Sequence, residues 1–270
     1  MKKKVLFVCI IFMFFSIFEV LLNGENQTSE SEPTQASLAE LDELMKNKTI
    51  TNCEKAIKGY ESLLKNDPDN YEILYKTANA YTAILDIKTS AIIVEKDEYK
   101  PMLKEKGKIA NTYAKKAYEL KPKDKDVVAA CLVSYAYYSA SMGILKAIFK
   151  GAGGHYKDLA RQLIEIDDKH LGALGYRMLG KFYHVAPWPV GSKKKALTFF
   201  KKALETDNTV LYCHYYVGLI QFKKKQYDDA KKEFTFVLDT EPASHESHYI
   251  QAYKKMARYY IRLINRRKQK

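Results

Sequence analysis

The sequence predicts an all-α protein, an α-solenoid of about five helix pairs with insertions in the middle pairs and a C-terminal capping helix. In five places a small or apolar residue is followed by two more, four and seven residues later, and then by Pro, Asp or Asn twelve residues after the first. Spacings of four and three residues place side chains on one stripe of a helix, and the fourth residue favours a helix end. The chain also has only 12 Gly and 7 Pro and few alternating β-branched runs, which argues against strands.

The period of the pattern indicates two antiparallel helices per unit. From Ala196 to Ala230, and again from Phe200 to Phe234, the interval is 34 residues. Each set marks the second helix of a pair. The five sets are Ala56, Tyr60, Leu63 and Pro68; Ala110, Ala114, Ala117 and Pro122; Tyr156, Ala160, Leu163 and Asp168; Ala196, Phe200, Ala203 and Asn208; and Ala230, Phe234, Val237 and Pro242.

Glycines in the first helices of two pairs complete the pattern. Leu179-Gly180 is followed by Tyr183, Val217 precedes Gly218, and Tyr227 opens the last second helix. A residue without a side chain lets the two helices of a pair approach closely. With the five sets above, these residues resemble the tetratricopeptide-repeat family over about residues 50 to 243. The resemblance implies a stack of helix pairs that presents a binding surface rather than a catalytic centre.

The start of the chain predicts export. Lys2 to Lys4 precede an apolar run from Val5 to Phe18, which is shorter than the ~20 residues of a membrane-spanning helix and is followed by Glu19. We expect a signal peptide over residues 1–24, cleaved or retained as an anchor, and a protein of the periplasm or cell envelope. A polar tether then covers residues 25–37, the helical repeats 38–245, and a capping helix with a basic tail 246–270.

Extra residues between the first and second helices of three pairs predict a functional edge. They are Ile87 to Gly107, Ser139 to Gly154 and Val185 to Ser192. Equivalent turns of a solenoid stack along one side, so the insertions should gather there. The second reads as a short amphipathic helix with Ile144 and Phe149, followed by a glycine hinge at 151–154.

The third insertion holds the only Trp of the chain, Trp188, between two prolines in a stiff loop. The indole either anchors an interface or packs on the neighbouring helix pair. Two functional hypotheses follow. In the first, the protein is an interaction scaffold whose concave groove and inserted edge bind an acidic or peptide-like protein partner, with Lys193, Lys194 and Lys195 beside Trp188.

The second hypothesis rests on a further resemblance. The predicted export signal, the irregular helix pairs and Ala186-Pro187 in the unit of Leu179-Gly180 are similar to the T component of tripartite TRAP transporters. This implies an accessory ligand-binding component that assists the transporter's substrate-binding protein. Its cavity would lie beneath the insertions, lined by Tyr135, Tyr137, Tyr138, Phe149 and Trp188.

Charge narrows the choice of partner. The chain carries 45 Lys and Arg against 32 Asp and Glu, a net charge of +13, which favours acidic partners. The last seventeen residues, from Lys254, hold eight basic residues and no acidic one, so the final helix presents a solvated face or rests on an anionic membrane surface. Export and the lack of a recognisable binding module exclude nucleic acid. Self-association remains a further partner hypothesis.

No enzyme chemistry is predicted, and no cofactor. The sequence has no G-x-S-x-G, phosphate loop, H-E-x-x-H or C-x-x-C-H motif. His245 and His248 share a helical face, but without a carboxylate or thiol cluster they predict no metal site. Cleavage of the signal peptide, which holds Cys9, leaves three of the four cysteines: Cys53, Cys131 and Cys213. They are an odd number spread over different repeats, so we expect buried thiols.

Overall fold

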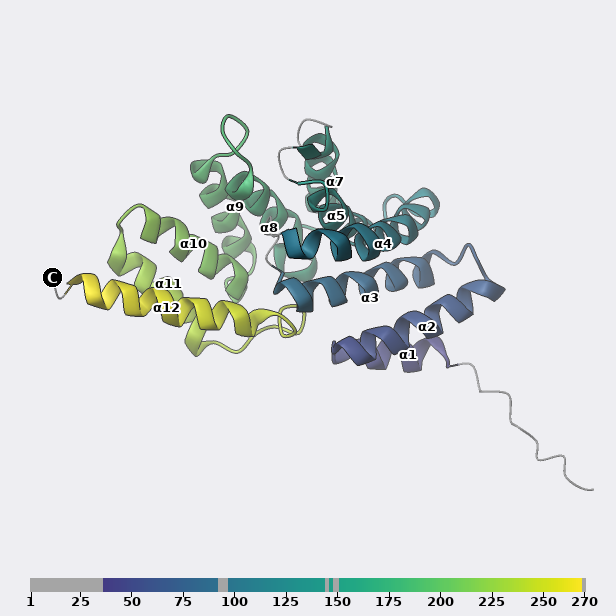
Figure 1. Ribbon diagram of the computed structural model, residues 1–270. Helices are drawn as coiled ribbons and strands as arrows, with labels where there is room; N and C mark the ends of the chain where they lie inside the picture. Colours follow the sequence, from purple (N-terminus) through teal and green to yellow (C-terminus); the bar gives the residue numbers. More distant parts are fainter. Residues whose placement is uncertain (1–35, 92–96, 144–145, 148–150, 269–270) are drawn as a thin grey trace, which may run out of the picture. The chain divides into compact units, whose positions relative to one another are not determined.

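The structure is a computed structural model that describes residues 36–91, 97–143, 146–147 and 151–268 (Figure 1). The predicted signal peptide, Ile144 and Phe149 lie outside the described residues. From Ala36 onward the chain forms one compact unit. Within this part every regular element is helical, and no strand is found. The predicted all-α class is confirmed.

In the described part of the chain the helices pack consecutively as five pairs, which confirms the predicted solenoid. The same residues contain one 3-10 turn, η1, over Asp97–Tyr99, and a last helix, α12, over Ile250–Lys268. The pairs are α1 (Leu38–Lys46) with α2 (Ile50–Asn66), α3 (Tyr71–Thr89) with α4 (Lys100–Leu120), α5 (Lys125–Ala140) with α7 (Ala152–Ile166), α8 (His170–Val185) with α9 (Lys193–Thr206), and α10 (Leu211–Lys223) with α11 (Tyr227–Asp239).

The repeat signature forms the core of the second helices. The small residues are fully buried, as at Ala56, Ala110 and Ala196, and so are the rings of Phe200 and Phe234. Each second helix ends two or three residues before the predicted stop. The helix ends and their stops are Asn66 and Pro68, Leu120 and Pro122, Ile166 and Asp168, Thr206 and Asn208, and Asp239 and Pro242.

Glycine sets the distance between the helices of the last two pairs, as predicted. A Cβ on Gly180 would lie 2.6 Å from the ring of Phe200, and one on Gly218 would lie 3.0 Å from the ring of Phe234. Both rings are fully buried and have no free space to move into. The phenyl groups therefore lie directly on the backbone of the facing helix.

Two of the three predicted insertions need correction. Most of Ile87 to Gly107 is helical, because α3 continues to Thr89 and α4 starts at Lys100. The predicted hinge at 151–154 is the start of α7, with Gly151 as N-cap at φ +79° and Gly153 and Gly154 inside the helix. The residues that follow the starts of α4 and α7 mostly have good helix propensity, so both helices begin earlier in the chain than the sequence analysis expects. The third insertion is a loop, residues 186–192, as expected.

The C-terminal helix caps the stack as predicted, and a second contact ties it to the N-terminal half. α12 packs on α11 and α10, with Tyr253 and Ile264 fully buried. In addition, the Tyr253 hydroxyl donates to the Ala91 carbonyl at 3.3 Å, and His248 Nε2 lies 3.2 Å from Asp86 Oδ2. The end of α3 and the start of α12 thus meet although 162 residues separate them.

Within the described residues the cysteines Cys53, Cys131 and Cys213 are buried free thiols, as expected. Burial raises the pKa of Cys53 to about 11 and that of Cys131 to about 12. Neither thiol is a reactive nucleophile at neutral pH.

Gly180→Ala and Gly154→Ala test the close helix approach. The methyl group that Gly180→Ala introduces would overlap the Phe200 ring, so we expect a loss of about 1–3 kcal/mol in unfolding free energy. Nothing lies within 4 Å of a Cβ at Gly154, so Gly154→Ala should stabilise by about 0.5–1 kcal/mol through helix propensity. Urea unfolding followed by circular dichroism measures both. Equal effects of the two substitutions would contradict the packing argument.

Candidate functional site

Trp188 is presented to solvent on a fixed loop. Its side chain is 89% exposed, the most exposed large apolar residue of the described chain. The Gly191 N–H donates to the Pro187 carbonyl at 2.7 Å, and the Ser192 N–H donates to the Tyr183 carbonyl at 2.9 Å. A Cβ on Gly191 would lie 1.8 Å from the Ala186 oxygen, so only glycine fits this turn. The indole is therefore not packed on the neighbouring helix pair, and its role as an interface anchor stays a prediction.

The three lysines after the loop differ in what they contact. Lys193 Nζ donates a hydrogen bond to the His184 carbonyl, and Lys195 Nζ lies 5.3 Å above the Tyr183 ring. Lys194 is exposed at the first turn of α9. Only Lys194 of the three is therefore uninvolved in holding the loop against α8.

The cavity predicted beneath the insertions is not formed by the expected residues. Tyr135 packs edge-on against His155, with ring centres 4.7 Å apart, and Tyr138 is half-buried near the backbone of α4. Trp188 is exposed, and Phe149 lies outside the described residues. Of the predicted lining, only Tyr137 reaches a cavity, which lies against the first helices of the pairs instead.

This cavity has a volume of about 340 Å³. Its walls come mainly from the first helices α1, α3, α5, α8 and α10 and from the segment 245–249 before α12, with Tyr60 of α2 and the connecting residues Lys48 and Ala91. The charged or titratable residues that line it are Asp42, Lys48, Tyr60, Tyr75, Lys76, Asp86, Asp126, Tyr137, Arg177, Lys181, Tyr212, His245, His248 and Tyr249. It is thus a mixed polar and aromatic pocket on the side of the solenoid formed by the first helices.

Several of these charges are already paired. Lys76 Nζ lies 2.6 Å from Asp42 Oδ2, and the Tyr60 hydroxyl donates to the other oxygen of Asp42 at 2.8 Å. Asp86 accepts from the Tyr137 hydroxyl and contacts His248. These pairs fix the orientation of α1, α3 and α5 around the cavity.

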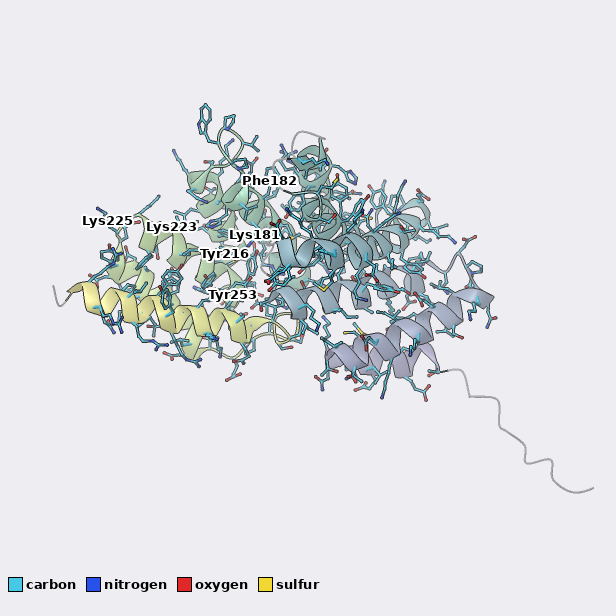
Figure 2. The ribbon with its side chains drawn as sticks, viewed as in Figure 1. Lys181, Phe182, Tyr216, Lys223, Lys225 and Tyr253 are labelled. Carbon is cyan, nitrogen blue, oxygen red and sulfur yellow. The ribbon has the colours of Figure 1, made fainter. Side chains whose placement is uncertain are left out.

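The α8 side of the cavity carries two buried cations one helical turn apart. Arg177 is 7% exposed and Lys181 is 4% exposed. Arg177 Nη1 lies 3.4 Å from Glu246 Oε1, and its Cζ lies 5.4 Å from the Tyr212 ring centre. Lys181 Nζ donates to the Tyr216 hydroxyl and lies 4.4 Å from that ring centre. Figure 2 shows Lys181 and Tyr216 together where α8 passes α10.

Sequence reasoning missed both cations. Arg177 and Lys181 occupy helical positions three and seven residues after the buried Leu174. Basic residues on the apolar stripe of a first helix are the signal that could have identified them, because Lys and Arg are almost never fully buried without a partner.

Two histidines near these cations, the buried His184 and the half-buried His245, resist protonation. Burial and the charges of Lys193, Lys181 and Lys223 lower the pKa of His184 to about 3. Burial and the charge of Arg177 lower the pKa of His245 to about 4. The His245 ring reaches its place because Gly172, at φ +65°, has no Cβ, which would lie 2.5 Å from His245 Nε2.

Two other features, a metal-binding cluster and a membrane-spanning helix, are absent from the described residues. No group of three or more His, Cys, Asp or Glu side chains is arranged to hold a metal ion there. No helix in that part of the chain has the length and apolar character needed to cross a membrane.

Comparison with known proteins identifies the fold. TTC0263, a thermophilic TPR protein of Thermus thermophilus, superposes with a TM-score of 0.55 at 13% identity, covering 78% of this chain and 92% of that chain. The chain has the tetratricopeptide-repeat fold. MamA gives a TM-score of 0.45 at 17% identity over 83% of this chain and 99% of its own, and yeast Tom70 gives 0.34 at 12% over 89% and 69%. These lower scores add nothing to the assignment.

No family model and no curated protein matches this sequence. The tetratricopeptide-repeat assignment therefore concerns the fold alone.

His184→Phe tests the buried histidine of this tetratricopeptide-repeat unit. In the unfolded chain His184 protonates near pH 6.5, whereas in the folded protein its pKa is about 3. The unfolded state thus binds one more proton between these values, so stability is full above about pH 6.5 and falls by about 1.4 kcal/mol per unit as pH is lowered. His184→Phe keeps an aromatic ring against Tyr216 but removes the titrating group, and with it this part of the pH dependence of stability. Urea unfolding at about pH 7, 6 and 5 should show that the unfolding free energy of the variant depends less on pH than that of the natural protein. Equal slopes for the two proteins would refute this role of His184.

Proposed function

We propose that this protein is a protein-interaction scaffold whose partner-binding edge is centred on Trp188. The observation that carries the proposal is the 89% exposed indole on a loop fixed by backbone hydrogen bonds. A rigid aromatic group loses little conformational entropy when it enters a partner's pocket, and Trp is enriched among residues that dominate binding energy. The tetratricopeptide-repeat fold supports this proposal because it presents extended surfaces.

The charge of the protein supports an acidic partner. The net charge is +13, and the exposed Lys194 lies close after Trp188 in the chain. Carboxylates at the rim of a partner's apolar pocket would meet this ammonium group while the indole enters the pocket. Rim charges of this kind raise the association rate more than the affinity.

Trp188→Ala tests the binding edge, with Tyr259→Ala as the matched control. Tyr259 is also an exposed aromatic residue, at 54%, but lies on α12. After cross-linking in cells and quantitative mass spectrometry, Trp188→Ala should reduce recovery of the main partner at least about tenfold, as expected of an interface anchor. Its unfolding free energy should change by no more than about 0.5 kcal/mol. The proposal fails if both variants recover the partner equally.

A second candidate function is that of an accessory ligand-binding component of a TRAP-type solute-uptake system. The cavity of about 340 Å³ favours this candidate, because it has the size of a small-molecule site. A transporter substrate-binding protein recovered in the cross-linking experiment would place it ahead of the general scaffold.

We also propose that the chain is exported. The support is the basic start followed by the apolar run from Val5 to Phe18. Expression of the full chain in bacteria, followed by fractionation and mass measurement, should find it outside the cytoplasm, either shortened at about residue 24 or intact and membrane-associated. Recovery of the intact chain in the cytoplasmic fraction would contradict export.

A further inference from the structure

Buried polar atoms without partners gather around the cavity. Among the described residues, six buried side-chain nitrogen or oxygen atoms have no hydrogen-bond partner. Three of them, Arg177 Nε, His245 Nε2 and His248 Nδ1, belong to residues that line the cavity. Buried polar groups in folded proteins are normally hydrogen-bonded. This concentration therefore points to an acceptor that enters from outside the chain.

Lys181 adds a buried charge at the same place. It lines the cavity, is 4% exposed, and has no ion-pair partner among the residues that the structure describes. Its ammonium group has three N–H donors, of which the Tyr216 hydroxyl accepts one. A buried cation is costly unless an anion or several acceptors surround it.

The rest of the cavity wall is apolar or aromatic on the same side. Leu174 and Met178 precede Lys181 on α8, and Val133 and the Tyr137 and Tyr249 rings face the same space. A ligand that fits must therefore combine one anionic end with an apolar body. Small-molecule sites commonly have this composition, with a few polar groups set in an apolar wall.

The surrounding charges restrict the anion to a single negative charge. Arg177 is already opposite Glu246, and Lys76 is paired with Asp42, so Lys181 is the buried lining cation without a carboxylate among the described residues, whereas Lys48, at the α1 end of the cavity, is half-buried. Asp86 and Asp126 also line the cavity and would repel a second negative charge. A monocarboxylate satisfies both conditions, whereas a phosphate dianion does not.

We propose that this cavity binds a small organic monocarboxylate with an apolar body, and that Lys181 and Arg177 bind its carboxylate. The carboxylate would accept from Lys181 Nζ and from the unpartnered Arg177 Nε, with the apolar body against Leu174, Met178 and Val133. This site is separate from the Trp188 edge and requires neither the scaffold nor the transporter proposal.

The neighbouring histidines are consistent with this site. Burial and the positive charge of Arg177 hold the pKa of His245 near 4, so His245 is neutral at pH 7. A neutral imidazole adds no competing cation, and its Nε2 can take part in a hydrogen bond with the ligand.

The test is calorimetric titration of the purified folded protein at constant ionic strength with phenylacetate, phenylacetamide and inorganic phosphate. Phenylacetamide has the same shape as phenylacetate without the charge. We expect phenylacetate to bind at least about tenfold more tightly than either other compound, since charge-assisted hydrogen bonds are the stronger ones. Lys181→Met should weaken phenylacetate binding at least about tenfold, and Lys194→Met, which removes an exposed lysine, should leave it unchanged.

Further variants keep the test decisive. If circular dichroism shows that Lys181→Met does not fold, Lys181→Gln replaces it. If neither variant folds, the ratio of the affinities of the natural protein for phenylacetate and phenylacetamide decides the test. Equal affinity for acid and amide, tighter phosphate binding, or phenylacetate binding unaffected by a folded Lys181 variant would each overturn the proposal. Trp188→Ala should retain phenylacetate binding. The proposed carboxylate site and the proposed partner-binding edge are therefore tested independently of each other.

Discussion

The geometry of the cavity depends on the fully buried carboxylate of Glu246. It accepts hydrogen bonds from the backbone N–H groups of Leu211 at 2.9 Å and Tyr212 at 3.0 Å, and it faces Arg177 of α8. Val210, the N-cap of α10, offers no side-chain acceptor, so Glu246, which is 35 positions from Leu211 in the sequence, accepts from the first donors of that helix. One side chain thus joins α8, α10 and the segment that leads into α12, and it brings His245 and His248 to the cavity wall.

The Glu246 network fixes the relative positions of α8, α10 and the 245–249 segment more than it stabilises the fold. Burial raises the pKa of Glu246 against the opposing effects of Arg177 and of the Tyr212 and Leu211 N–H groups. The environment therefore disfavours the charged carboxylate even with its partners present, as is typical of buried ion pairs. Loss of either partner would leave a buried charge or several unpaired N–H groups, which is far more costly than the intact network. The network consequently admits one register of α8, α10 and the 245–249 segment.

The sequence predicted the solenoid because its determinants are local. Spacings of four, seven and twelve residues identify a second helix and its end, and Gly180 and Gly218 mark where rings of the partner helix approach. The hinge at 151–154 was wrong because glycine is compatible with the first turn of a helix once Gly151 supplies the left-handed cap. The cavity could not be predicted because its pairs span 69 residues between Arg177 and Glu246 and 162 between Asp86 and His248. No periodic pattern encodes such distances.

Trp188 and Lys181 place opposite demands on the folded state. An exposed indole costs the fold almost nothing, because the loop that holds it is stabilised by its own backbone hydrogen bonds. A buried ammonium group without a carboxylate costs free energy that a Met or Leu at position 181 would not. Folding alone gives no reason for a Lys on the inner stripe of α8, next to an arginine whose Nε lacks a hydrogen-bond partner. An incoming carboxylate supplies that reason, because it would turn an unfavourable buried charge into a charge-assisted hydrogen bond at the moment of binding.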